Sequence, residues 1–182
     1  MIGCVMQEPN DDQGTILRWE DHIVPILEHP DIHIRNKALI AVAWEVYSRP
    51  TELHRLTFGN VQDKGDHMII RLTGLRGRDR QLIIDKSTPY LREWMQDSHP
   101  VTKWFTADVE PLADTDPDTP IWTYTAENER LASDALRRIT KRASERADVS
   151  ANVTLNNIRR SRVFLLVAES GLRPATLSRL LG

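Results

Sequence analysis

Apolar side chains recur at helical spacing along most of this chain of 182 residues, and one short central stretch breaks that period. There the pattern changes to two apolar runs, His67–Leu72 and Gln81–Ile84, which are typical of β-strands. Gly74 and Gly77 supply a turn between them, so the pattern predicts an antiparallel hairpin. A single hairpin is too small to organise a domain. The expected fold is therefore mainly α, with a small inserted antiparallel β hairpin or sheet (α+β).

The helical stretches also predict which side chains face inward. These stretches are 16–27, 35–47, 89–96, 129–147 and 156–169, with a last one beginning at Pro174. The expected buried side of the second comprises Ala38, Leu39, Val42, Ala43 and Val46. The expected outer face of the fourth carries Arg130, Arg137, Arg138, Lys141 and Arg142. We expect residues 1–14 to be disordered and residues 15–182 to form one domain, with residues 98–120, which hold four prolines, as a long surface loop.

Composition narrows the functional classes. The formal net charge is −2 and the pI is about 6.3, so any nucleic-acid contact must come from a local group of arginines and lysines. Cys4 is the only cysteine, which excludes an intramolecular disulfide and predicts a reducing, cytoplasmic location. No apolar run is long enough to cross a membrane. His29 and His33 have the spacing of a zinc pair, but Pro30 separates them and no further ligand follows, so we expect neither metal nor cofactor.

Two segments carry a specific signature. Trp44–Val61 reads WEVYSRPTELHRLTFGNV, in which a helix ends before Arg49 and Glu52, Leu53 and Leu56 follow. The last 28 residues read LNNIRRSRVFLLVAESGLRPATLSRLLG, in which Ile158 and Arg159 open a helix that is followed by a glycine and a Leu-Gly pair. In order and spacing, with the hairpin between them, these segments resemble the two conserved boxes of the tyrosine recombinases (phage integrase type) over roughly residues 16–182. The N-terminal part is also similar to integrase-like proteins of salt-loving archaea.

The resemblance implies a chemistry. Tyrosine recombinases integrate and recombine DNA by breaking it with a tyrosine hydroxyl, which forms a 3′-phosphotyrosyl link without metal or nucleotide. Two arginines clamp the attacked phosphate because each can donate two parallel hydrogen bonds to its oxygens. By position these would be Arg49 and Arg159, with Glu52 in support. The implied partner is double-stranded DNA, on which the protein would assemble as a homo-oligomer.

Three departures from the family pattern affect the expected activity. Leu75 or Arg76 stands where the family has a lysine that protonates the leaving oxygen, and arginine is a poor proton donor. Asn156 stands at the position of a histidine and cannot act as an acid or base. No tyrosine follows the second box, because the only tyrosines are Tyr47, Tyr90 and Tyr124. Either a natural continuation of the chain supplies the nucleophile or the chain has kept only the DNA-binding surface, and in both cases we expect these residues alone to bind DNA without cutting it.

Further arginines are candidate DNA-binding residues, with plainer alternatives. Arg76, Arg78 and Arg80 could form a basic finger along the DNA backbone or merely a solvated loop, and Arg160 and Arg162 extend the second box. Arg49 by itself could equally pair with Glu52 or Glu45 within the protein.

Two other classes of function remain as alternatives. Residues 168–182 also resemble a helix-turn-helix, with Thr176, Ser178 and Arg179 as base-contacting residues, which would make the chain a transcription regulator. That hypothesis leaves the hairpin and the segment around Arg49 unexplained. A helical protein-interaction domain, the third alternative, explains none of the arginine spacing.

Overall fold

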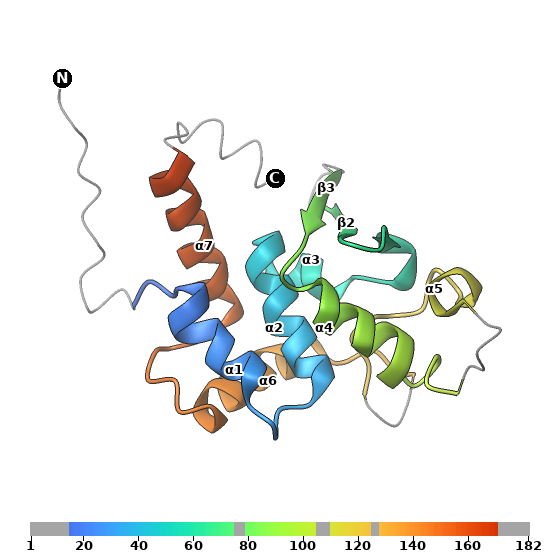
Figure 1. The fold of residues 1–182 in the computed structure, drawn as a ribbon, viewed down its shortest axis with the longest axis horizontal. Helices are drawn as coiled ribbons and strands as arrows, with labels where there is room; N and C mark the ends of the chain where they lie inside the picture. The colour runs from blue at the N-terminus through green and yellow to red at the C-terminus, as the bar shows by residue number, and fades with distance from the viewer. Residues whose placement is uncertain (1–14, 75–78, 105–109, 125–127, 171–182) are drawn as a thin grey trace.

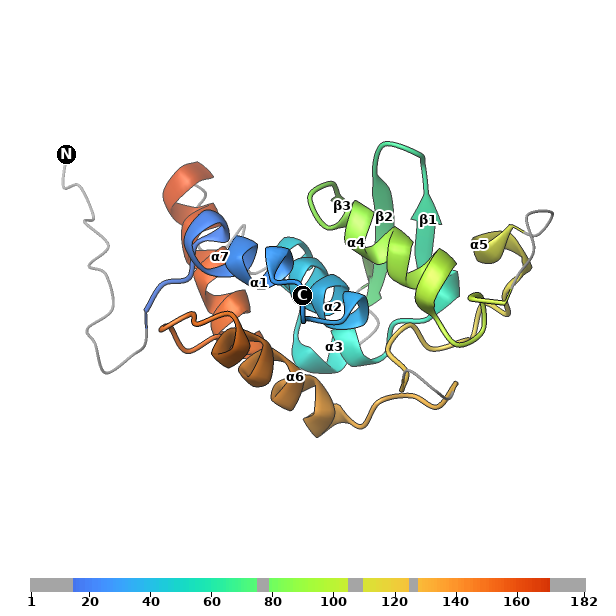
Figure 2. The ribbon, with the colours of Figure 1, turned by 60° about the horizontal axis from the view of Figure 1, so that its bottom comes forward.

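The central element of the fold is helix α2 (Ile34–Val46), which lies between α7 (Leu155–Ser170) on one side and the small sheet on the other (Figure 1, Figure 2). The structure is a computed structural model that describes residues 15–74, 79–104, 110–124 and 128–170. Within these residues a mainly helical fold surrounds a small antiparallel sheet, which confirms the predicted fold class. None of the helices in these ranges is both long and apolar enough to cross a membrane.

The middle of helix α2, residues 38–44, is buried on every side. The sequence predicts one inward face, but Ile40, Ala41 and Trp44 are buried as well. Helices α1 (Val24–Glu28), α4 (Thr88–Glu93), α6 (Ser133–Arg146) and α7 all pack against it, and a helix that is apolar all round is stable only when it is covered in this way. The helix ends at Tyr47, which adopts the left-handed conformation with φ of 36°. Arg49 then precedes Pro50, the first residue of α3 (Pro50–His54).

The sheet has three antiparallel strands in the order β1-β2-β3. The predicted hairpin corresponds to β2 (Met68–Thr73) and β3 (Asp79–Ile84), and β1 (Val61–Asp63) is an addition that its three residues were too few to signal. The register pairs Val61 with Ile70 and Met68 with Ile84. Because side chains alternate across a strand, Met68, Ile70 and Leu72 face the core. Residues 75–78, which include the expected turn, lie outside the described residues.

The first predicted helix is divided, and its proline explains where. A π-helical turn, η2 (Trp19–Ile23), precedes α1, and Pro25 occupies the second position of α1. Proline lacks the backbone N–H that a helix interior needs, but the first turn of a helix does not use it. Residues 1–14 lie outside the described residues, so the expected disorder there stays a prediction.

The predicted surface loop at residues 98–120 contains four buried residues among those described. It follows α4 and the π-helical turn η4 (Trp94–Ser98) and contains α5 (Pro111–Asp114). His99, Thr102, Thr115 and Thr119 are buried. The His99 ring bonds to the Pro120 oxygen (3.0 Å) and Trp94 Nε1 donates to the Ile121 oxygen (2.8 Å). These bonds satisfy polar groups that burial takes from water.

Helix α6 is amphipathic as predicted, with Ala135, Leu136 and Ala143 buried. Arg130 is an exception to the predicted outer face. It precedes the helix, and its guanidinium donates to the backbone oxygen of His54 at 2.6 Å, which joins this segment to α3. A short 3-10 turn, η3 (Phe58–Asn60), completes the connection from α3 to β1.

Candidate functional site

The connection between α2 and α3 places Arg49 at the N-terminal end of α3. Its backbone is extended there (φ −69°, ψ 149°), and its N–H group donates to Glu52 Oε2 at 2.7 Å. This bond satisfies one of the amide groups that a helix start leaves without an internal partner. The carboxylate of Glu52 is thereby turned back toward the α2–α3 connection.

Glu52 joins three arginines that come from different parts of the chain. Arg80 of β3 donates from Nη1 to Oε1 (2.8 Å) and from Nη2 to Oε2 (3.0 Å), a bidentate pair. Arg159 of α7 lies with Nη1 3.7 Å from Oε2. Together with the backbone of Arg49, these contacts bring α3, β3 and α7 to one carboxylate, whose side chain is only 4% exposed. We call Arg49, Glu52, Arg80 and Arg159 the arginine cluster.

Arg159 reaches back to the end of α2. Its Nη1 donates to the backbone oxygen of Tyr47 at 2.9 Å, two residues before Arg49. Burial lowers the pKa of the Arg159 guanidinium, Glu52 opposes that change, and the positive charges of Arg49 and Arg80 lower the pKa further. The side chain of Arg159 thus lies against the connection between α2 and α3, which carries Arg49.

Glu52 is ionised at neutral pH. Burial by itself would raise the pKa of Glu52, but the hydrogen bonds from Arg80 and the Arg49 N–H, together with the charges of Arg80 and Arg159, lower it below its usual value. Three guanidinium groups and one carboxylate leave the arginine cluster positively charged. A protein with a net charge of −2 therefore has a local basic site, as the composition required for any nucleic-acid contact.

The structure bears on the plainer interpretation of Arg49. Glu45, the other proposed partner, binds elsewhere: its carboxylate accepts the backbone N–H groups of Asp85 (3.2 Å) and Ser87 (2.7 Å) and the Ser87 hydroxyl (2.5 Å). It thus holds the chain where it enters α4. Glu52 accepts the backbone N–H of Arg49, and its two oxygens are engaged by the Arg80 side chain.

Arg80, which the sequence grouped with Arg76 and Arg78 as a basic finger or a solvated loop, lies in β3. Its guanidinium binds Glu52, and its side chain is 12% exposed. Arg76 and Arg78 lie outside the described residues. The signal that could have located Arg80 is its spacing from the turn, because the alternation along β3 decides which side chains of the strand face α3.

The other candidate residues of the second box lie along α7. Asn156 is exposed on the first turn. Arg160 is also exposed and donates to Asn157 Oδ1 at 2.9 Å. Nη1 of Arg162 lies 3.7 Å from Oε2 of Glu169. Arg162 also lines a hollow of about 610 Å³, together with Trp19 and Trp44. These contacts of Arg160 and Arg162 are made within α7, whereas Arg159 is the residue of the second box that approaches Glu52.

Asn157, which the sequence did not single out, has a structural role. Its side-chain amide donates to the backbone oxygens of Asn152 (2.8 Å) and Thr15 (3.3 Å), and the residue is buried. Next to it, the Ser161 hydroxyl accepts the N–H of Leu17 (2.9 Å). These bonds fasten the first described residues to α7, so of the neighbouring asparagines 156 and 157 the second one serves the fold.

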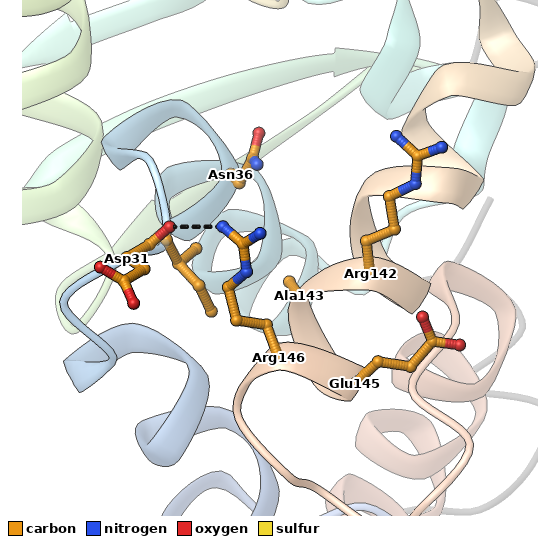
Figure 3. Close-up of a pocket in the computed structure, with 7 residues that line it drawn as sticks. Asp31, Asn36, Arg142, Ala143, Glu145 and Arg146 are labelled. Carbon is orange, nitrogen blue, oxygen red and sulfur yellow. Dashed lines mark hydrogen bonds between the residues drawn. The ribbon is translucent and has the colours of Figure 1, made fainter.

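A second hollow lies apart from the arginine cluster. It has a volume of about 540 Å³ and lies between α6 and the connection from α1 to α2. Figure 3 shows Arg142 and Arg146 among the residues that line it. Arg146 donates to the backbone oxygen of Asp31 at 3.0 Å. The Glu145 side chain points away from Arg146 (Figure 3). None of the four residues of the arginine cluster lines this hollow. Within the described ranges, no three His, Cys, Asp or Glu side chains gather in a way that could hold a metal ion.

Comparison with known proteins gives the family. Residues 19–182 match the phage integrase family. The structure is similar to that of XerA recombinase, with a TM-score of 0.70, 18% sequence identity, and coverage of 97% of this chain and 57% of that chain. It is also similar to XerH site-specific recombinase bound to its difH substrate in a pre-cleavage complex, with a TM-score of 0.66, 15% identity, and coverage of 90% of this chain and 44% of XerH. A post-cleavage complex of XerH with a palindromic difH substrate gives a TM-score of 0.66 at 16% identity, covering 98% of this chain and 49% of that chain.

This chain belongs to the phage integrase family, the tyrosine recombinases, as the two boxes predicted. It spans about half the length of the recombinase structures that it resembles. At these identities the likenesses establish the fold. No curated protein matches the sequence. Nothing in these comparisons supports the helix-turn-helix hypothesis, and residues 171–182, which hold its base-contacting side chains, lie outside the described residues.

Proposed function

We propose that this chain binds duplex DNA in the manner of a tyrosine-recombinase catalytic domain, with Arg49 and Arg159 holding one backbone phosphate. The observation that carries the proposal is the bond from Arg159 to the Tyr47 oxygen, together with the bond from the Arg49 N–H to Glu52, the carboxylate that Arg159 approaches. These two bonds support the proposal because they bring the Arg159 side chain and the backbone of Arg49 to the same connection between α2 and α3.

The chemistry of a phosphodiester fits the arginine cluster. Each non-bridging oxygen of the phosphate accepts hydrogen bonds, and an arginine presents paired N–H donors with matching geometry. Negative charge grows on these oxygens when the phosphate is attacked, so the same arginines would stabilise that transition state. The XerH structures are complexes with a DNA substrate before and after cleavage, and we extend the DNA partner to this chain by its family.

Cleavage is a separate question from binding, and we propose that these 182 residues bind DNA without forming a phosphotyrosyl bond. Burial, with a contribution from Glu28, raises the pKa of the Tyr90 hydroxyl, which makes it a poor nucleophile. Tyr124 is 40% exposed and lies on the segment that leads into α6, where its N–H donates to the Glu129 oxygen. Tyr47 offers its backbone oxygen to Arg159. Asn156 and Arg76, at the positions of a histidine and a lysine, would bind the phosphate or its neighbours and would not transfer protons.

The remaining roles in this proposal come from the family resemblance and the sequence. Arg76, Arg78, Arg160 and Arg162 would contact the DNA backbone on either side of the clamped phosphate. The protein would act in the cytoplasm, as the lone Cys4 suggests, and assemble as a homo-oligomer on DNA. Its N-terminal part supports a place among the integrase-like proteins of salt-loving archaea.

Binding to duplex DNA at a series of salt concentrations tests the proposal. Arg49→Ala and Arg159→Ala should each weaken binding by about tenfold or more and reduce the slope of log affinity against log salt by about one, since each removes a phosphate contact. Lys64→Ala is the matched control, because it also removes one positive charge. Lys64 is exposed in the connection between β1 and β2, whereas Arg80 pairs with Leu72 near the opposite end of β2. Wild-type affinity and slope in both arginine variants would refute the clamp.

The absence of cleavage is tested with a nicked duplex that traps covalent intermediates. Wild-type protein should give no protein–DNA adduct after denaturation. An adduct that disappears in Tyr47→Phe would show that the nucleophile is present in these residues after all.

A further inference from the structure

Glu52 shares its two oxygens unequally among the arginines. Arg80 takes both of them, at 2.8 and 3.0 Å, while Arg159 stays 3.7 Å away, beyond hydrogen-bond distance. The short bond of Arg159 goes instead to the Tyr47 oxygen at 2.9 Å. The carboxylate is thus occupied by the arginine that the family's chemistry does not require, and the arginine expected to hold phosphate is held by a neutral group.

Arg80 is placed for this pairing. Its side chain is 12% exposed, and its Nε is buried without a hydrogen-bond partner among the described residues. The register of the hairpin pairs Arg80 with the buried Leu72, so the strand itself sets where the guanidinium lies. Leaving a buried Nε without a partner costs free energy. The two hydrogen bonds from the terminal nitrogens of Arg80 to Glu52 therefore have to offset that cost, which makes Glu52 the partner that fixes this side chain.

We propose that Arg80 is a positioning residue: by occupying both oxygens of Glu52, it keeps this carboxylate from closing onto Arg159 and so leaves the donors of Arg159 available to a DNA phosphate. This inference rests on the proposed clamp. A buried carboxylate without a cation is costly, and among the described residues Arg159 is the other guanidinium that lies within 4 Å of Glu52, at 3.7 Å. Without Arg80, the gap of 3.7 Å closes, Arg159 becomes an internal ion pair, and the phosphate competes with Glu52 for it.

The positioning role of Arg80 predicts that a second substitution restores DNA binding, which a simple loss of charge does not. Arg80→Met should weaken duplex binding by about tenfold at moderate salt, because it disables Arg159 as well as removing a charge. Adding Glu52→Gln to Arg80→Met should restore binding to within about threefold of wild type, together with the salt slope, since the competing carboxylate is gone. The neutral amide that Glu52→Gln introduces still accepts the Arg49 N–H through its oxygen, so the start of α3 is kept.

Two further variants separate the alternatives. Arg80→Lys keeps the charge but not the paired donors, and its affinity should lie closer to that of Arg80→Met than to wild type. Arg71→Met is the control on the same hairpin, since Arg71 also pairs with an acid, Asp79 at 2.8 Å, but is 58% exposed; it should bind like wild type.

The outcomes are decisive in either direction. Arg80→Lys with wild-type affinity, or a double variant no better than Arg80→Met, would overturn the inference and make Arg80 a direct phosphate ligand. Loss of thermal stability in Arg80→Met with unchanged DNA affinity of the folded protein would assign Arg80 a purely structural role and also overturn it.

A measurement without DNA keeps this test distinct from that of the clamp. In ¹⁵N spectra of the arginine side chains, the Arg159 signals should shift in Arg80→Met and return in the double variant. If wild-type protein does not bind duplex DNA while these shifts occur, the clamp is wrong and the exchange of partners is right. Unchanged Arg159 signals in Arg80→Met would refute the exchange whatever the protein binds.

Discussion

The arginine cluster and the outer face of α6 hold basic residues in two different ways. On α6, Arg138 pairs with Asp134 and Lys141 lies 3.8 Å from Glu145, each one helical turn apart and well exposed. In the arginine cluster, one carboxylate that is 4% exposed joins residues from α3, β3 and α7. The α6 pairs are local and solvated, so each is formed and lost without consequence for the rest of the fold. The cluster is assembled by the tertiary structure and in turn fastens three elements together.

In a protein with a net charge of −2, the number of basic residues in a segment does not by itself locate the basic site. Five basic residues between 137 and 146 make α6 a strongly basic stretch by count, and its two acids, Asp134 and Glu145, each pair with one of them at the exposed surface. The arginine cluster has fewer charges, but they are buried, so each affects its neighbours more strongly. The pKa of Arg159 is lowered first by burial and then by the positive charges of Arg49 and Arg80. A count of charges along the sequence does not measure this.

Removing the Glu52 carboxylate, which the arginines share, should lower the stability of the protein more than any other change considered. Glu52→Ala leaves Arg80 and Arg159 without their buried counter-charge, and we expect the free energy of unfolding to fall by about 3–5 kcal/mol. Urea denaturation monitored by circular dichroism measures it. A loss below about 1 kcal/mol would mean that the cluster is no more integrated than an exposed ion pair.

His99, a buried histidine outside the arginine cluster, should make the stability of the protein depend on pH. Burial lowers the pKa of His99 to about 4 from 6.5, against the opposing hydrogen bonds at the Pro120 and Ile121 backbone. Below pH 6.5 the unfolded chain takes up a proton at this histidine while the folded chain does not, so stability falls as the pH drops toward 4 and then levels off, by up to about 3 kcal/mol. Denaturation at several pH values measures the slope. His99→Gln should flatten it in that window, and an unchanged slope would contradict the neutral, buried ring.

The charge of Glu52 gives a smaller effect with its own pH range. Because its folded pKa lies below the usual 4.5, the ionised carboxylate stabilises the protein above that pH, and the contribution is lost as the pH falls through the lowered value. The difference in stability between wild type and Glu52→Gln should therefore be larger at pH 7 than at pH 3. Both proteins keep His99, so the subtraction isolates Glu52. A difference that is constant with pH would show that hydrogen bonding alone, and not charge, holds the cluster.

The α6 pairs should give the smallest effect. Asp134→Ala removes the partner of Arg138 on a face where both side chains are more than half exposed, and stability should change by no more than about 0.5 kcal/mol, less at high salt. The same denaturation assay applies. A loss comparable to that of Glu52→Ala would erase the distinction between the two regions.

Much of the fold could be predicted because its signals are local. The change of period located β2 and β3, and the spacing of Arg49, Glu52 and Arg159 within two boxes identified the family. Ser48, Arg49 and Pro50 marked the break between α2 and α3 because proline favours the first turn of a helix.

The rest depends on what packs against what. The burial of Ile40 and Ala41 follows from the helices that cover α2, which the sequence of α2 does not contain. Likewise the partner of Arg80 lies 28 positions away, and only the register of the hairpin and the placement of α3 bring the two together. For the same reason residues 98–120 looked like a loop: Thr102 and His99 are satisfied by backbone oxygens that no local pattern announces.

The most direct test of the account is a double-mutant cycle in duplex-DNA affinity with Arg49→Ala, Arg159→Ala and the two combined. If both guanidinium groups hold one phosphate, the combined variant should lose markedly less binding free energy than the two single losses added together, because either substitution already disrupts the shared contact. Losses that simply add would mean that the two arginines bind at independent places, and the central claim would be wrong.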